Sequence, residues 1–527
     1  MANIVRQPCD EGVIASRPAA APCSKAWRPW VLAATILGSS MVFIDGTVVN
    51  VVLPALQANL NATAVDMQWV VESYALFLAA LLLVGGSLGD HFGRRLVLSV
   101  GVALFALASV WCGLAPSIRQ IIAARAVQGV GGALLVPGSL AIISASFRNE
   151  DRGQAIGTWS GFTAITAAVG PVMGGWLIEN VSWRAVFFIN APLAAVVLVL
   201  VFWHVPESRD EGGSNGLDWL GAALATASLG AIVYGLIESS SLGFGNPQVL
   251  TALILGVVTS TLFVFVEAQK RNPMLPLTLF RSRDFSGANL LTLLLYAALS
   301  GALFFLPLNL IQVQGYTATS AGAALLPFIL IMFLLSRWAG GLVKRYGTKL
   351  PLVVGPVVAA LGFALFTRPG IRSGYWTTFF PAVVVLGFGM AISVAPLTTT
   401  VMNAVGESWA GIASGVNNAV SRTAGLIAVA AFGLVMLNAF GNRFDQRLFD
   451  LGVSPDVQRT LDDQRVKLAG AVVPTELDPA VQTAVRRAID ESFVSGFRKV
   501  MMISAALAFL SALVAWLLIR GNRTARA

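Results

Sequence analysis

Three ionisable side chains lie inside long apolar stretches of this sequence, namely Asp45, Glu72 and Arg125. An ionisable residue within an apolar helix usually marks a proton site, a ligand site or an ion pair. We expect Asp45 to bind a proton, and Arg125 to control that binding by moving toward or away from it. The alternative for these two residues is a static buried ion pair. Glu72 is either a second proton or cation site or a residue in contact with water near the outer mouth.

Other polar and aromatic residues are candidates for binding a larger ligand. Arg422 falls near the middle of a later apolar stretch, where it could pair with a carboxylate, attract an anionic substrate or donate to backbone carbonyls. Asn50, Tyr74, Phe162 and Tyr296 are candidates for the wall of an apolar cavity. Most aromatic side chains in such helices simply pack or face lipid, so each of these assignments stands beside a structural alternative.

The elements that position these residues follow from composition. The chain has 527 residues, of which 56% are hydrophobic and only 12% are charged. Soluble domains carry about 25% charged residues, so most of this surface must face lipid. Apolar runs of roughly 20 residues recur along the chain and must be helical, because lipid offers no hydrogen-bond partners. We therefore predict an all-α membrane protein with about fourteen transmembrane helices.

The distribution of basic residues predicts the orientation. Lys and Arg gather in both tails and in alternate short loops, which the positive-inside rule places in the cytoplasm. This explains the net charge of +9 without nucleic acid, and no basic face with interleaved aromatics is present. We predict a disordered cytoplasmic tail over 1–28, followed by a six-helix half over 29–205. A linker with two inserted helices covers 206–268, the second six-helix half covers 269–519, and a second cytoplasmic tail covers 520–527.

One long loop, 439–496, interrupts the second half between predicted helices at 410–438 and 497–519. It is rich in charged residues of both signs and predicts short amphipathic helices outside the cytoplasmic membrane. A lid or docking surface is one interpretation. A solvated helical hairpin without a specific role is the other.

An internal repeat supports the division into halves. The loop Gly86–Arg95 aligns with Gly340–Lys349, and Arg152–Gly157 aligns with Ala410–Gly415 at nearly the same offset. Duplicated halves are a common plan of secondary transporters. Lys344 stands in the second half where the first has Asp90, so the chemistry of this loop is specific to the first half.

The loop Gly86–Arg95 predicts a charged conformational latch. Gly86 and Gly93 permit a tight turn between packed helices. Asp90 can pair with Arg94, with Arg95 or with the positive N-terminus of a neighbouring helix. Such a contact could be remade when the two halves rock. The alternative is a turn anchored by charges that serve only the topology.

By these motifs the chain resembles the major facilitator superfamily, and within it the fourteen-span drug:proton antiporter family of the multidrug efflux type. The resemblance rests on the latch, on Asp45-Gly-Thr-Val-Val-Asn50, on Arg125-Ala-Val-Gln-Gly129 and on a fifth-helix element. That element, which the family associates with antiport, comprises Gly157, Gly170, Pro171, Gly174 and Gly175. Proline removes an intrahelical hydrogen bond and glycines allow close helix approach, although a simple packing kink is the alternative. Thr166 replaces a glycine that is usual in the family.

The resemblance implies a proton-coupled antiporter that exports amphipathic drugs or antibiotics, including cationic dyes, across a bacterial-type cytoplasmic membrane by alternating access. No cofactor is expected, because Gly129–Gly132 lacks the Lys-Ser/Thr of a phosphate loop, and the proton gradient would supply the energy. Expected partners are the lipid bilayer, protons, a small amphipathic substrate and, in a host with an outer membrane, a periplasmic adaptor; nucleic acid is not expected. The alternatives are export of one endogenous metabolite or lipid, solute uptake, and a membrane-embedded enzyme or receptor. The last is disfavoured because no metal-ligand cluster or nucleophile triad is visible.

Overall fold

The computed structural model describes residues 27–147, 149–208, 218–270, 273, 275–405 and 410–520. Most of the predicted N-terminal tail, the tail after Arg520 and part of the predicted linker lie outside these residues. Within the described ranges, 13 helices are long and apolar enough to cross a membrane, and Lys349–Leu365 is a shorter apolar helix. The predicted all-α membrane fold with about fourteen spans is thereby confirmed.

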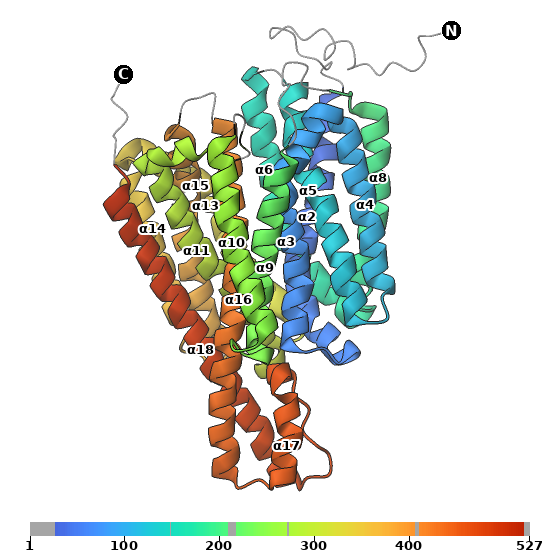
Figure 1. Cartoon of the computed structure of the whole chain (residues 1–527), viewed down its shortest axis with the longest axis vertical. Helices are drawn as coiled ribbons and strands as arrows, with labels where there is room; N and C mark the ends of the chain where they lie inside the picture. The colour runs from blue at the N-terminus through green and yellow to red at the C-terminus, as the bar shows by residue number, and fades with distance from the viewer. Residues whose placement is uncertain are drawn as a thin grey trace.

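The first group of helices forms one bundle around its own apolar core (Figure 1). Its longest members exceed the roughly 20 residues that a span needs. Thr63 and Asp66 form a capping box that fixes the start of the helix Ala64–Phe92. The helices are α2 (Arg28–Leu60), α3 (Ala64–Phe92), α4 (Arg94–Leu114), α5 (Ile118–Ser146), α6 (Asn149–Asn180), α7 (Ala185–Phe188) and α8 (Asn190–His204).

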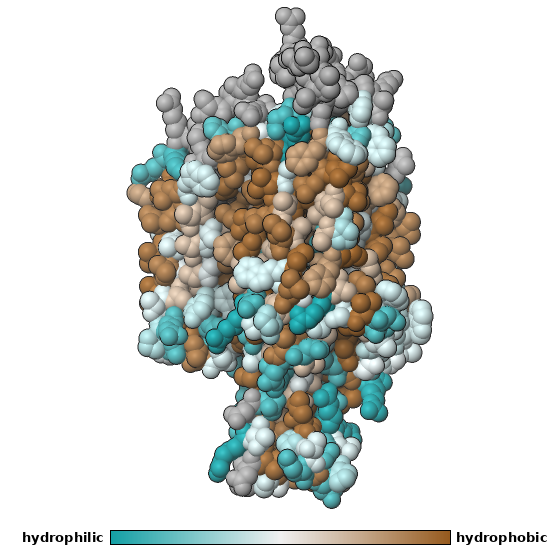
Figure 2. All heavy atoms as spheres, turned by 90° about the vertical axis from the view of Figure 1, so that its right-hand side faces the viewer, coloured by the Kyte–Doolittle hydropathy of each residue, from teal (hydrophilic) through white to brown (hydrophobic). Residues whose placement is uncertain are grey.

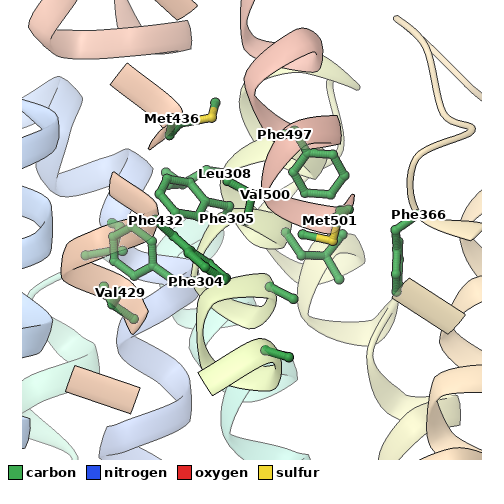
Figure 3. Close-up of a cluster of buried hydrophobic side chains, with 14 of the residues drawn as sticks. Phe304, Phe305, Leu308, Phe366, Val429, Phe432, Met436, Phe497, Val500 and Met501 are labelled. Atoms are coloured by element: carbon green, nitrogen blue, oxygen red, sulfur yellow. The ribbon is translucent and has the colours of Figure 1, made fainter. Parts of the chain in front are cut away.

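The second group packs around a larger core rich in phenylalanine and methionine. Figure 3 shows part of it, where Phe304 and Phe305 meet Phe432, Phe497 and Met501. The helices of this group are α11 (Arg283–Leu308), α12 (Ala318–Ala323), α13 (Leu326–Tyr346), α14 (Lys349–Leu365), α15 (Phe380–Asn403), α16 (Ala410–Leu451) and α18 (Pro479–Leu518), with π-turns η2 (Asn309–Val313) and η3 (Tyr375–Phe379) and the 3-10 turn η1 (Leu277–Arg281).

The inserted helices are α9 (Trp219–Leu242) and α10 (Pro247–Gln269). They pack against each other, and α9 also contacts α3 of the first group and α16 of the second. In Figure 1 the pair lies in front of the line along which the two groups meet. The insertion therefore covers one side of the interface between the groups.

The long loop differs from the prediction. Helices α16 and α18 run on without a break where short amphipathic helices were expected, and only α17 (Pro455–Gln464) and the 3-10 turn η5 (Arg465–Gly470) are short. Residues 439–496, here called the arm, project beyond the bundle (Figure 1). Hydropathy marks where hydrocarbon ends, whereas the backbone hydrogen bonds of a helix can continue into water. Ion pairs of Arg447 with Glu491 and of Arg465 with Asp445 link the helices of the arm.

The surface agrees with this division. On the face that Figure 2 shows, the bundle is mostly brown and hydrophobic, whereas the arm below it is mainly hydrophilic. Helices α2 and α18 begin and end, respectively, at the side opposite the arm (Figure 1). We call that the terminal side and the other the arm side.

Candidate functional site

A buried network of three polar side chains joins α2 to α5. Arg125 forms an ion pair with Asp45 and donates a hydrogen bond from Nη1 to Oε1 of Gln128 at 2.8 Å. Gln128 in turn donates from Nε2 to Oδ1 of Asp45 at 2.9 Å, and Arg125 Nε donates to the carbonyl of Val70 at 3.1 Å. Asp45 and Arg125 are each only 1% exposed, and Gln128 is fully buried. Each side chain satisfies the others, which is what makes a buried charge pair tolerable. Gln128 stands within the motif Arg125-Ala-Val-Gln-Gly129, but no role was predicted for it.

Tyr74 of α3 belongs to this network. Its ring lies 4.1 Å from the Arg125 guanidinium carbon, a cation–π distance, and its hydroxyl donates to the carbonyl of Val42 at 3.4 Å. A Cβ atom at Gly129 would come within 2.4 Å of the Tyr74 carbonyl oxygen, so glycine is required for α5 to approach α3 this closely. The structure thus places Tyr74 beside the charge network, and Tyr74 is not among the residues that line the large cavity described below.

The glycines of the α6 element serve two contacts. A Cβ atom at Gly170 would lie 2.6 Å from Thr47 Oγ1, and one at Gly174 would lie 1.9 Å from Val48 Cγ2, so α6 packs directly on the part of α2 that carries Asp45. A Cβ atom at Gly175 would lie 2.5 Å from the Ala318 backbone of α12, in the other half. Gly157, by contrast, has open space around it and lines the cavity.

A cavity of about 930 Å³ lies between the two halves. It is bounded by α2 and α6 on one side and by α11, α13 and α15 on the other, and includes Asn50, Pro171 and Phe333. Its size matches pockets that enclose a small molecule. No charged side chain is found among the described residues that line it.

Two predicted wall residues lie elsewhere. Phe162, next to the cavity-lining Gly161, is 51% exposed and is not a lining residue. Tyr296 is partly exposed and packs against the core of the second half. Of the four predicted wall residues, Asn50 is the one that the structure places at the cavity.

Polar contacts close the interface between the halves at the arm side. Each of three hydrogen bonds joins a residue of the first half to one of the second, namely Gln312 Nε2 to Gln57 Oε1 at 2.7 Å, Thr319 N to Glu179 Oε1 at 2.7 Å and Gln68 Nε2 to the Val429 carbonyl at 2.8 Å. The arm adds to this seal, because Gln57 Nε2 donates to the Lys467 carbonyl at 2.9 Å. None of these residues was predicted, because polar residues that lie far apart in the chain form no local sequence pattern.

The latch contains one ion pair that was predicted and one contact that was not. Asp90 pairs with Arg94 at 2.8 Å, one of the partners expected for it. The backbone N–H of Arg95 instead donates to Oε1 of Glu207 at 3.0 Å, so Glu207 caps the N-terminus of α4. Gly93 has a φ of +113°, and a Cβ atom there would lie 2.6 Å from Glu207. Gly86 is in ordinary contact with Pro137 of α5. Glu207 was missed because it lies far from the latch in sequence.

The last two candidates are Glu72 and Arg422. Glu72 is 1% exposed, and its Oε2 atom has no hydrogen-bond partner among the described residues. The burial does not fit the interpretation that Glu72 is in contact with water. Arg422 on α16 is partly exposed and forms no ion pair with any residue that the structure describes.

Comparison with known proteins agrees with this architecture. The chain is 32% identical over 499 residues to the multidrug resistance protein Stp of Mycobacterium tuberculosis (strain ATCC 25618 / H37Rv), covering 92% of this chain and 91% of that protein. It is 32% identical over 493 residues to the tetracenomycin C resistance and export protein of Streptomyces glaucescens, covering 93% and 91%. It is 35% identical over 451 residues to the puromycin resistance protein pur8 of Streptomyces alboniger, covering 84% and 88%.

Solved structures share the fold. A bacterial homolog of the human lysosomal transporter Spinster, in an inward-facing and unoccupied conformation, aligns with a TM-score of 0.67 at 19% identity, covering 94% of this chain and 98% of that one. The inward open xylose transporter XylE from E. coli aligns with a TM-score of 0.59 at 13% identity, covering 94% and 97%. The family model described as Major Facilitator Superfamily matches residues 35–429, and the chain is therefore a multi-pass membrane transporter that belongs to this superfamily.

Proposed function

We propose that this transporter is a proton-coupled antiporter that exports amphipathic drugs or antibiotics by alternating access. The observation that carries the proposal is the position of the Asp45–Arg125 pair. Asp45 lies on α2 within two turns of Thr47 and Asn50, which line the cavity, yet it is itself sealed from solvent. A carboxylate so placed can take part in proton exchange without touching the cargo.

The coupling would work through the packing of α2. In the present state Asp45 pairs with Arg125 and accepts a hydrogen bond from Gln128, and the halves are closed at the arm side. When the halves rock, the Gly170 and Gly174 contacts would carry α2 with α6 and separate Asp45 from Arg125. The uncompensated buried carboxylate would then take up a proton, since desolvation disfavours charge. Return of Arg125 would release that proton on the other side.

The cargo is inferred from the relatives and the cavity. Three similar proteins are named as multidrug, tetracenomycin C and puromycin resistance proteins. The apolar lining of the cavity suits an amphipathic molecule. We further propose that the protein lies in a bacterial-type inner membrane with its terminal side facing the cytoplasm, as the basic loops indicate. The proton gradient across that membrane would supply the energy.

Efflux from cells tests the proposal. The native chain, Asp45→Asn and Asp151→Asn are expressed at equal levels in a drug-sensitive bacterium, and accumulation of puromycin and tetracenomycin C is measured with and without a protonophore. Asp151 is a matched control, because its side chain is 46% exposed in the same half. We expect the native chain and Asp151→Asn to lower accumulation of at least one drug, protonophore to abolish this, and Asp45→Asn to lack it. Efflux that persists with protonophore, or an active Asp45→Asn, would contradict the proposal. Unchanged accumulation of both drugs would favour export of an endogenous metabolite or lipid.

A further inference from the structure

Arg422 is a membrane-embedded cation that has no counter-charge among the described residues. It lies 12 residues into α16, which at 1.5 Å per residue places it roughly 18 Å along the helix, near the middle of a bilayer about 30 Å thick. Asp45 and Arg125, which also lie within the membrane, form an ion pair with each other, and Arg125 donates a further hydrogen bond to Gln128. No ion pair or hydrogen bond of the Arg422 guanidinium is found among the described residues, and its side chain is partly exposed.

On the arm side of Arg422, the face of α16 that carries it packs against other helices. A Cβ atom at Gly425, one turn onward, would lie 3.0 Å from Ser300 Oγ of α11. Val429, two turns onward, accepts a hydrogen bond from Gln68 of α3. One turn in the other direction, Asn418 is exposed. The same face is thus packed toward the arm side and exposed at Asn418 toward the terminal side.

The electrostatic surroundings of Arg422 link it to the proton network. Tyr74 lies within electrostatic reach of Arg422, and the same tyrosine covers the guanidinium of Arg125. Arg422 therefore acts electrostatically on the same tyrosine as Asp45 and Arg125 do.

An unpaired arginine in the middle of the membrane is costly unless it faces water or an anion. Its planar guanidinium offers five donors in a fork that matches a carboxylate or another oxyanion. The described residues that line the cavity between the halves include no acidic side chain that would hold a cationic drug. We propose that Arg422 binds the anionic group of the exported molecule, so that the site favours amphipathic acids over their neutral or cationic analogues. This inference rests on the proposed function, because only that function makes the bound molecule an exported one.

Direct binding tests the inference without any gradient. N-dansyl-phenylalanine, its N-methylamide and dansylcadaverine share one apolar fluorophore and present a carboxylate, a neutral amide and an ammonium, respectively. Their affinities are measured by fluorescence titration against purified protein in detergent, with protein-free micelles as background. The variants are Arg422→Gln, Arg422→Lys and, as a control on the same helix, Arg443→Gln on the arm, where Arg443 bonds to Gln446.

We expect the native chain to bind the acid at least about tenfold more tightly than the amide or the amine, the order of one charge-assisted contact. Arg422→Gln should weaken binding of the acid about tenfold and leave the amide unchanged, Arg422→Lys should lie between, and Arg443→Gln should match the native chain. Equal native affinities, no binding of the acid, or unchanged acid binding in Arg422→Gln would overturn the inference. If Arg422→Gln fails to fold, full native selectivity in Arg422→Lys together with the same selectivity for a phosphonate analogue would overturn the planar guanidinium contact.

The outcomes separate this inference from the function on which it rests. Acid-selective binding through Arg422 combined with efflux that ignores protonophore would leave the binding site standing and remove the antiporter. Protonophore-sensitive efflux combined with equal binding of acid and amide would do the reverse.

Discussion

Arg125 and Asp45 are buried partners whose geometry leaves neither side chain free to meet water. The carboxylate accepts from Arg125 and from Gln128, and the guanidinium also holds the Val70 carbonyl of α3. Three helices of the first half, α2, α3 and α5, therefore meet at one ion pair. Any motion of α2 against α5 must either carry this pair along or break it.

Removing one member of the pair is expected to cost stability that removing the other restores. Arg125→Gln leaves the Asp45 carboxylate buried without a counter-charge, which typically costs about 3–5 kcal/mol. The double variant Asp45→Asn/Arg125→Gln removes both charges of the pair and should recover most of this loss. The measurement is the thermal unfolding midpoint of purified protein in one detergent. Additive losses in the double variant would show that the two side chains do not act as a pair.

The α6 glycines provide a matched pair of substitutions. Gly175→Ala would force α6 away from the Ala318 backbone, because the new Cβ atom would lie 2.5 Å from it, whereas Gly157→Ala meets nothing within 4 Å. We expect Gly175→Ala to open the arm side. A cysteine introduced at Asn50, in a background whose natural cysteines are replaced by alanine, should then react faster with a membrane-impermeant thiol reagent added on that side. Equal labelling rates in the two glycine variants would argue against this contact as a closure.

Glu207 is expected to matter more for stability than Asp90. Glu207 caps α4 through the Arg95 N–H, and losing such a cap costs about 0.5–2 kcal/mol. The Asp90 carboxylate is 46% exposed and pairs with Arg94 at the surface, where ion pairs contribute about 0–1 kcal/mol. The unfolding midpoint of Glu207→Ala should therefore fall further than that of Asp90→Ala. The opposite order would return the structural role to Asp90.

The closed arm side predicts a conditional cross-link. Gln57→Cys/Gln312→Cys joined by a short bis-methanethiosulfonate reagent should block transport, because the two side chains belong to different halves and now lie 2.7 Å apart. Reduction should restore it. Arg28→Cys/Asp151→Cys is the control, since this pair is also in contact, at 2.7 Å, but within one half. Transport that continues with the first cross-link intact would mean that the halves do not separate there.

The sequence predicted most of the architecture because lipid imposes a simple rule. Apolar runs must be helical and long enough to span, so the helices that carry Asp45, Glu72 and Arg125 were readily found. The continuation of α16 and α18 into the arm escaped this rule, because water permits both helix and loop there.

Contacts between distant segments were harder to predict than helices. Glu207 contacts the latch although helices α4 to α8 separate the two in sequence. Nothing near Asp90 in the sequence signals a second carboxylate at this site. Tyr74 carries an aromatic ring that suits a cavity wall equally well, and only the packing of α3 on α5 places it over Arg125. The sequence shows Arg422 as a charge within an apolar helix, but only the folded structure shows that no described residue pairs with it.

Proton movement driven by drug tests the central claim most directly. Proteoliposomes are loaded with a pH-sensitive dye and with a drug that the native chain exports from cells, and are then diluted into drug-free buffer with the membrane potential clamped at zero. The account predicts that drug leaving through the native chain acidifies the lumen, and that Asp45→Asn shows no drug-dependent acidification. Acidification by Asp45→Asn at the native rate would contradict it.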